Sequence, residues 1–225
     1  MARHGNSRHL NGMNAPQYYA LHRKEQFYVS KPRAGRHTAS TSMPLSLLLK
    51  KIEVVRTSGE AERILLDGKV MVNGRVVKDP KYAVGLNDLV EIPDAEKSFS
   101  VSVDEMAHFA AMEADKDYKH IYKVVGKYKT SGGKVMVRLH DGTSVASDGK
   151  VNVNDSVVLG KERKIEKVLH LKEGSSCFVM AGVHVGASGS IKQLKEGSMS
   201  RPRSVLVDQG NGSFETIVNN IIIVG

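Results

Sequence analysis

The stretch 67-DGKVMVNGRVV-77 predicts a helix end, a short strand, a tight turn and a return strand in close succession. The pair Asp67-Gly68 is typical of a helix C-terminus, because glycine adopts the left-handed conformation there without a Cβ penalty. Val70 and Val72 alternate as residues of a strand do. The pair Asn73-Gly74 favours a type I′ turn, which needs positive φ at both of its central residues. The stretch therefore predicts a β-hairpin that directly follows a helix.

Two amphipathic helices are predicted before this hairpin. Ser42 is suited to cap the first helix and Pro44 to occupy its first turn. Its apolar stripe comprises Leu45, Leu48, Leu49, Ile52 and Val55. The segment 57-TSGE-60 is a capping-box pattern that opens the second helix. Beyond the hairpin, 86-LNDLVEI-92 is typical of a turn that leads into a strand, which completes a compact unit.

Positive charge is concentrated at the start of the chain. Residues 1–51 hold nine Lys and Arg against the single acid Glu25, a balance of 9 − 1 = +8. The other residues hold 33 − 9 = 24 bases and 24 − 1 = 23 acids. A basic segment attached to a nearly neutral body favours phosphate binding, since each bound cation releases counterion. A disordered basic tail that only aids solubility is the alternative interpretation.

The N-terminal segment also carries aromatic and imidazole side chains at irregular spacing. These are His4, His9, His22, His37, Tyr18, Tyr19, Phe27 and Tyr28. We expect such a segment not to fold alone but to become ordered on RNA, with guanidinium groups on phosphates and rings on bases.

Several functional classes are excluded by composition. The 225-residue chain has no apolar run long enough for a membrane helix and no apolar region of a secretory signal, so we expect a cytoplasmic protein without a membrane partner. Cys177 is the single cysteine, which excludes an internal disulfide and a cysteine zinc site. No nucleophile, base and orienter occur at a recognisable spacing, and the carboxylates between Asp104 and Asp117 suit a solvated surface. We expect no catalytic residue, metal, cofactor or small-molecule substrate.

The second half of the chain is predicted to be rich in β-structure. Residues 98–125 are interpreted as a connector, with a strand at 98–103 and a short helix within 104–122. Further strands are predicted at 121–129, 134–139, 151–159, 163–171, 176–182, 204–208 and 214–225, separated by Gly, Asp and Asn turns.

The run 45-LSLLLKKIEVVRTSGEAERILLDGKVMVNGRVVKDPKYAVGLNDLVEI-92 resembles the S-four-type RNA-binding domain. The resemblance implies an L-shaped surface for structured RNA near Arg56, Thr57, Glu62, Arg63, Lys69, Asn73 and Arg75. Gly68, Asn73 and Gly74 are interpreted as scaffold first and RNA contacts second. Residues 42–94 hold eight bases and eight acids, so affinity depends on how these charges segregate.

A second resemblance covers 179-VMAGVHVGASGSIKQL-194, which is similar to the KOW motif of small SH3-like barrels. Ala187 stands where that family often has a basic residue, so we expect RNA contacts from Lys192, Lys195, Arg201 and Arg203 rather than from the loop tip. A P-loop is excluded because the Gly-Lys-Ser/Thr ending is absent.

Over nearly its whole length the chain resembles the archaeal and eukaryotic-type small-subunit ribosomal proteins of the S-four-e family. The opening Met1-Ala2-Arg3, then Asn14-Ala15-Pro16, and the order of the domains carry this resemblance. Family members usually have a tryptophan where this chain has Tyr18 and Tyr19, and the short C-terminus suggests an archaeal form.

The fold class we expect is α+β and multi-domain. It comprises an extended basic arm (1–41), a small α/β S-four-type domain (42–95), a central β-rich domain (96–173) and a KOW/SH3-like barrel (174–225). The function implied is a structural constituent of the small ribosomal subunit, located in the cytoplasm within the ribosome, with small-subunit ribosomal RNA and neighbouring ribosomal proteins as partners. An RNA-modifying enzyme and a KOW-containing transcription factor are the alternatives. The candidate RNA-binding residues are Arg3, Arg8, His9, Asn14, Arg23, Lys24, Arg33, Arg36, His37, Lys50, Lys51, Arg56, Thr57, Arg63, Lys69, Asn73, Arg75, Lys192, Arg201 and Arg203.

Overall fold

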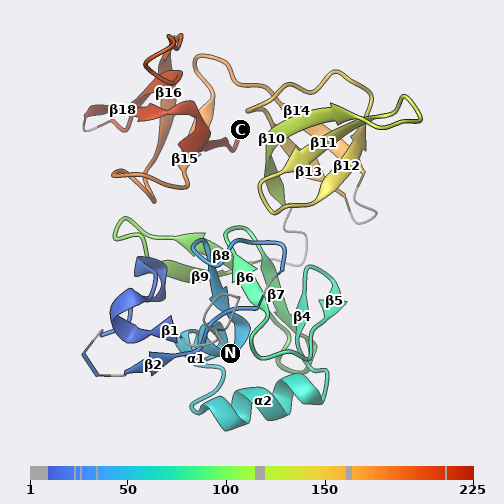
Figure 1. Cartoon of the computed structure of the whole chain (residues 1–225), viewed down its shortest axis with the longest axis vertical. Coiled ribbons are helices and arrows are strands. Elements are labelled where there is room, and N and C mark those ends of the chain that lie inside the picture. Colours follow the sequence, from blue (N-terminus) through green and yellow to red (C-terminus); the bar gives the residue numbers. More distant parts are fainter. Residues whose placement is uncertain are drawn as a thin grey trace, which may run out of the picture. The chain divides into compact units, whose positions relative to one another are not determined.

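The chain divides into two compact units (Figure 1). The first comprises Met1–Ser102 and His108–Lys116, and the second comprises Val103–Ala107 and Asp117–Gly225. The computed structural model describes residues 10–22, 24–25, 27–33, 35–114, 120–160, 164–210 and 212–225. Strands dominate and the helices are short, which agrees with the predicted α+β class.

The first unit contains both predicted helices, α1 (Leu45–Lys51) and α2 (Ser58–Leu66). Ser42 does not cap α1 as expected, because it lies in strand β3 (Ser42–Pro44), which pairs with β6 (Ala83–Gly85). The buried Ser42 hydroxyl instead donates a hydrogen bond to the Thr38 carbonyl at 2.7 Å. Pairing with a distant strand therefore determines where α1 begins.

Helix α2 begins and ends as its local sequence predicts. The Thr57 hydroxyl accepts a hydrogen bond from the Glu60 backbone N–H at 3.2 Å, and the Glu60 carboxylate accepts one from the Arg56 N–H at 2.9 Å. At the other end Gly68 has φ +73° and donates its N–H to the Leu65 carbonyl at 3.0 Å. These bonds satisfy backbone groups that every helix terminus leaves without partners.

The predicted hairpin is formed by β4 (Met71–Val72) and β5 (Arg75–Val76). Asn73 and Gly74 have φ values of +51° and +73°, as a type I′ turn requires. The hairpin belongs to a five-stranded sheet of order β5-β4-β7-β8-β9. Its other strands are β7 (Leu89–Ile92), β8 (Lys97–Val103) and β9 (Phe109–Glu113).

Strands β8 and β9 extend this sheet past residue 95, where we expected the domain to end. The prediction of a short helix within 104–122 is wrong for the described part of that segment, where 109–113 form β9 and 121–122 begin the next strand. The physical reason is tertiary: β9 joins the sheet edge beside β8, and Phe109 is buried with 1% exposure. Sheet pairing and burial override a weak helical pattern.

The N-terminal segment is packed against the first unit rather than extended. Strands β1 (Leu10–Asn11) and β2 (Tyr28–Val29) pair antiparallel. Tyr19 and Val29 are buried, and the Tyr18 ring stacks on Phe109 with centroids 5.0 Å apart. The described residues between Leu10 and Val29 therefore pack within the fold and do not form the extended arm that we expected, while residues 1–9 lie outside the described residues.

The second unit contains two five-stranded antiparallel sheets. The first has the order β12-β11-β10-β13-β14. Its strands are β10 (Ile121–Lys129), β11 (Val135–Leu139), β12 (Ser144–Ser147), β13 (Ser156–Leu159) and β14 (Ile165–Leu169). All but β12 were predicted, and β12 was missed because Ser144–Ser147 is short and only one of its residues, Val145, is buried.

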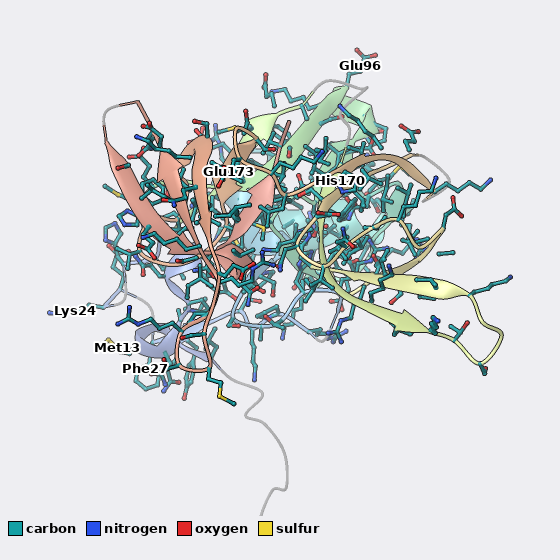
Figure 2. All side chains as sticks on the ribbon, turned by 90° about the horizontal axis from the view of Figure 1, so that it is seen from above. Met13, Lys24, Phe27, Glu96, His170 and Glu173 are labelled. Carbon is teal, nitrogen blue, oxygen red and sulfur yellow. The ribbon has the colours of Figure 1, made fainter. Side chains whose placement is uncertain are left out.

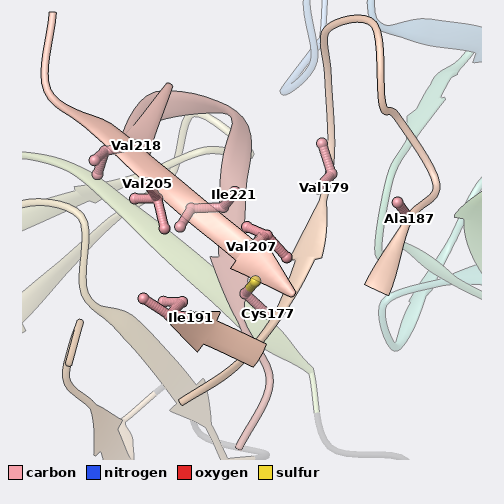
Figure 3. Packing of buried hydrophobic residues seen from close by; sticks show 8 residues of the cluster. All are labelled: Cys177, Val179, Ala187, Ile191, Val205, Val207, Val218 and Ile221. Atoms are coloured by element: carbon pink, nitrogen blue, oxygen red, sulfur yellow. The ribbon is translucent and has the colours of Figure 1, made fainter. Parts of the chain in front are cut away.

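The second sheet has the order β18-β17-β16-β15-β19. Its strands are β15 (Ser176–Val179), β16 (Ser188–Lys195), β17 (Ser204–Asp208), β18 (Ser213–Ile217) and β19 (Ile221–Ile223). Figure 3 shows its core, which comprises Cys177, Val179, Ala187, Ile191, Val205, Val207, Val218 and Ile221. Burial raises the pKa of the Cys177 thiol to about 11, so the cysteine acts as a core residue.

A glycine in the loop between β15 and β16 is required by close packing. Gly186 has φ +84°, and a Cβ at this position would lie 2.4 Å from the backbone of Asp104, in the same unit. Ala187, which replaces the basic residue of the KOW pattern, is buried in the core with 7% exposure. Ala187 therefore contributes to the packing of the core.

Candidate nucleic-acid interface

The surface around α2 and the β4–β5 hairpin presents cations without acidic partners. Arg63 is exposed on α2, Arg75 is exposed on β5, and Arg56 is exposed directly before α2. Lys50, in the last turn of α1, is half-buried. Within the described ranges, none of these four has an acidic side chain within 4.0 Å. Such groups keep their charge available for phosphates.

Four of the eight acids in residues 42–94 are engaged in contacts, one of which is Asp88, a partner of Asn73. Asp79 accepts a hydrogen bond from Arg33 at 2.9 Å, and Asp94 lies 3.2 Å from the amine of Lys69. The Glu60 carboxylate belongs to the cap of α2. The helix-hairpin surface therefore carries Arg56, Arg63 and Arg75 together with two exposed acids, Glu62 on α2 and Asp67 directly after it. Among the candidate residues, Arg33 and Lys69 already have acidic partners.

Asn73 holds the hairpin turn to the next strand. Its side-chain amide donates to an Asp88 oxygen at 2.7 Å, and its side-chain carbonyl accepts from the Leu89 N–H at 2.8 Å. The second Asp88 oxygen accepts from the Gly85 N–H at 2.9 Å. Asn73 therefore has the scaffold role expected of it, with both ends of its side chain engaged.

His37 also joins this buried cluster. Its Nε2 lies 3.0 Å from the Asp88 carboxylate, with side chains 4% and 3% exposed, although the ring N–H is not aligned for a regular hydrogen bond. The ring packs so closely on Gly85 that a Cβ there would lie 2.5 Å from it. The fold encloses the imidazole, so that a contact of His37 with RNA stays a prediction.

Asp88 is held in its charged form. Burial alone would raise the pKa of this carboxyl, but the adjacent His37 imidazole, together with the hydrogen bonds from the Gly85 N–H and the Asn73 amide, lowers the pKa below its ordinary value. A charge this deeply buried is tolerated only when it is paired and hydrogen-bonded. The cluster therefore belongs to the scaffold of the interface.

Two of the four aromatic residues in the N-terminal segment are exposed. Phe27 and Tyr28 are 74% and 61% exposed, with their rings edge to face at 4.7 Å. Figure 2 shows Phe27, Met13 and Lys24 projecting from this region. Tyr18 and Tyr19 instead pack within the unit. The exposed rings of this segment are thus Tyr28, on β2, and Phe27, directly before it.

The remaining candidates in this segment differ in their surroundings. Asn14 and Lys24 are exposed, whereas Arg36 is half-buried and engaged in a contact. Arg3, Arg8, His9 and Arg23 lie outside the described residues.

A hollow of about 270 Å³, which the sequence did not indicate, lies beside the segment and includes Pro16, Leu21, His22 and His108 in its lining.

The structural surroundings of the other candidates are equally mixed. Thr57 uses its hydroxyl for the helix cap, and Lys51 is exposed but engaged in a contact. In the second sheet of the second unit, Lys192 lies 3.8 Å from Asp208, while Arg201 and Arg203 are exposed. Lys195 donates to Glu215 at 2.7 Å, and this bond and one from Ser204 lower the pKa of Glu215.

Neither a metal centre nor a membrane helix is present in the parts of the chain that the structure describes. No group of three His, Cys, Asp or Glu side chains gathers there with the geometry to hold a metal ion. No helix of those parts is long and apolar enough to cross a membrane.

Comparison with known proteins gives three family matches in sequence order. These are the RS4NT domain over residues 4–40, the S4 domain over 43–90 and the ribosomal family S4e over 95–174. The S4 domain is the S-four-type domain described above, and its match spans α1, α2 and the hairpin.

Whole-chain relatives agree with these matches. The chain is 33% identical over 219 residues to the small ribosomal subunit protein eS4 of Methanocella arvoryzae, covering 96% of this chain and 94% of that protein. It is 35% identical over 220 residues to eS4 of Archaeoglobus fulgidus, covering 96% and 93%. The crystal structure of 30S ribosomal protein S4e from Thermoplasma acidophilum aligns with a TM-score of 0.67 at 27% identity, over 82% of this chain and 94% of that chain.

Proposed function

The chain belongs to the ribosomal protein S4e family, and from this premise we propose that it is an RNA-binding structural constituent of the small ribosomal subunit. Its partners are small-subunit ribosomal RNA and neighbouring ribosomal proteins, and it works in the cytoplasm as part of the ribosome. As a member of a ribosomal-protein family it is not an enzyme, which sets aside the RNA-modifying alternative.

The observation that carries this proposal is the cationic helix-hairpin surface of the S4 domain. Lys50, Arg56, Arg63 and Arg75 have no acidic partner in the described residues, and the exposed acids on α2 and directly after it are Glu62 and Asp67. Cations in this state neutralise phosphates and release counterions, and a surface of fixed shape selects structured RNA. Binding, rather than turnover, is thus the mechanism.

The finer assignments are part of the same proposal. The N-terminal segment would bring its cations, together with exposed Phe27 and Tyr28, to the RNA. Residues 174–225 would act as a KOW/SH3-like module, a reading supported by their five antiparallel strands and by the tight packing of Gly186. Arg201 and Arg203, both exposed, are the candidates for RNA contacts in this module.

The proposal is tested by filter binding of purified full-length protein to small-subunit ribosomal RNA. Arg63→Glu is expected to weaken binding about tenfold or more, because it replaces an attraction to phosphate by a repulsion. Lys97→Glu is the matched control, since Lys97 is an exposed lysine on β8 outside the helix-hairpin surface. Equal affinities for wild type and Arg63→Glu, with circular dichroism unchanged, would count against the S4 surface as the RNA site.

A further inference from the structure

The outer face of β10, β11 and β12 has a composition unlike that of a sheet covered by its own fold. In Figure 1 these strands lie side by side in green to yellow. Directly paired residues of antiparallel strands share a face. One face carries Val137 and Val145, both buried. The residues next to Val137 and Val145 along their strands, with their cross-strand partners, therefore lie on the opposite face.

Two rows of residues make up this outer face. The first row is Gly126, Arg138 and Ser144, and the second is Tyr128, Met136 and Ala146. Tyr128 is 46% exposed, and Arg138 and Ala146 are also exposed. The Arg138 guanidinium lies over Gly126, where an added Cβ would be in ordinary contact with it at 3.5 Å. An aromatic ring and a planar cation thus lie on adjacent rows, among small residues that leave room above the sheet.

The β10–β11 hairpin carries charges of one sign only. Residues 121–140 contain five Lys and Arg and no Asp or Glu. Near the hairpin tip, Lys129 and Lys134 are exposed and, within the described part of the chain, lie more than 4.0 Å from any acidic side chain. Lys127 is different, since its amine donates to the carbonyls of Gly149 and Val151 at 2.6 and 3.1 Å and so pins the hairpin to the chain after β12.

We propose that the outer face of β10–β11–β12 is a second RNA-binding site, at which an unpaired nucleotide stacks on Tyr128 while Arg138 and Lys134 contact its phosphates. This inference rests on the proposed ribosomal function and adds to it a site in the second unit. Bases that are splayed out of a helix are bound by stacking on exposed aromatic rings and by arginine planes. The ring, the adjacent guanidinium and the uniformly positive hairpin supply these groups.

The partner is RNA rather than protein because of the charge pattern. A protein-binding patch of this size would bring several large apolar side chains to its centre. Here the residues around Tyr128 are Gly126, Ala146 and the half-buried Met136, and the charged residues of the β10–β11 hairpin are all basic. A polyanion with accessible rings fits this surface better than an apolar partner does.

The test is equilibrium binding of the full-length protein to a 12-nucleotide unstructured RNA and, separately, to small-subunit ribosomal RNA. Tyr128→Ala is expected to weaken binding to the 12-nucleotide RNA by about tenfold, the effect of losing one stacked base, whereas Tyr128→Phe keeps the ring and stays within about twofold of wild type. Arg138→Glu is expected to weaken binding similarly. Lys167→Glu, at an exposed lysine on β14 at the far edge of the same sheet, is the charge control.

A second readout locates the contact directly. Ultraviolet cross-linking of the wild-type complex with ribosomal RNA, followed by mass spectrometry, is expected to find the cross-linked nucleotide on the peptide that contains Tyr128. Wild-type affinity in Tyr128→Ala together with no cross-link at this peptide, while ribosomal RNA is still bound, would overturn this inference and leave the proposed function standing. Tyr128 covered by a ribosomal protein in assembled subunits would also overturn it. Failure of the wild type to bind ribosomal RNA would instead refute the proposed function.

Discussion

The imidazole of His37 lies 3.0 Å from the carboxylate of Asp88, and both side chains are enclosed within the first unit. One residue comes from the N-terminal segment and the other from the turn before β7. Through Asp88 the same cluster reaches Asn73 in the hairpin turn and the N–H of Gly85. The N-terminal segment and the S4 scaffold are therefore joined by a buried polar network, which holds the hairpin that carries Arg75.

Asp88→Asn is expected to destabilise the first unit by about 3 kcal/mol at neutral pH, because it removes the charge that His37 and the surrounding N–H groups stabilise. Urea unfolding followed by circular dichroism measures this. Asp94→Asn, which removes only the exposed pair with Lys69, is the control and is expected to change stability by less than about 1 kcal/mol.

The effect of Asp88→Asn should depend on pH in a defined direction. The pKa of Asp88 in the folded protein is lowered from its ordinary value of 3.8, so its stabilisation is present above that value and is lost as the pH falls through the lower folded pKa. The stability difference between wild type and Asp88→Asn should therefore shrink on acidification below about pH 4. A difference that stays constant to lower pH would contradict the charged state assigned to Asp88.

Tyr19→Phe is expected to stabilise the protein by about 1 kcal/mol. The Tyr19 hydroxyl is buried without a hydrogen-bond partner in the described residues, and burial raises the pKa of this phenol well above its usual range. Removal of an unsatisfied buried hydroxyl removes its desolvation cost. Tyr18→Phe, at the half-buried ring that stacks on Phe109, is the control and should be nearly neutral. A loss of stability in Tyr19→Phe would show that the hydroxyl has a partner.

Because of Lys123, we expect the second unit to become more stable as the pH rises. Its buried amine donates to the carbonyls of Val218 and Ile221 at 2.6 and 2.8 Å, and burial lowers the pKa of the amine to about 8. Between about pH 8 and pH 10.5, the ordinary pKa of the lysine amine, the unfolded chain therefore binds more protons than the folded chain. Wild-type stability should rise across this range relative to Lys123→Met by about 2–3 kcal/mol. Parallel pH profiles in chemical denaturation would contradict this.

The basic residues at the very start of the chain should contribute to the salt dependence of RNA binding. Replacing Arg3 and Arg8 by Gln removes two cations without altering the described fold. The slope of log affinity against log salt should become shallower by about one to two. The double Lys variant keeps the charges and should keep the wild-type slope. Identical slopes for all three proteins would mean that these arginines do not meet phosphates.

Local chemistry made much of the S4 unit predictable. The cap at Thr57, the helix stop at Gly68 and the turn at Asn73-Gly74 follow from hydrogen bonds and φ preferences within a few residues, and the structure has each of them. The alternation of apolar residues likewise predicted most strands of the second unit. These signals need no knowledge of the tertiary fold.

Long-range packing could not be predicted in the same way. His37 and Tyr19 are buried through contacts with distant segments, and β9 forms because it joins the sheet beside β8. The face around Tyr128 and Arg138 becomes recognisable only from the register of three strands. In each case the sequence shows the residue type but not its neighbours, and the neighbours decide whether a polar or aromatic group is buried or exposed.

Co-sedimentation tests the central claim most directly. The native protein, detected by antibody in a cell extract from its source, is separated on a sucrose gradient in high salt, which strips weakly bound proteins from ribosomes. A constituent of the small subunit should remain in the small-subunit fractions. Recovery of the protein chiefly in the light fractions at the top of the gradient, while other small-subunit proteins stay with the particle, would contradict the account.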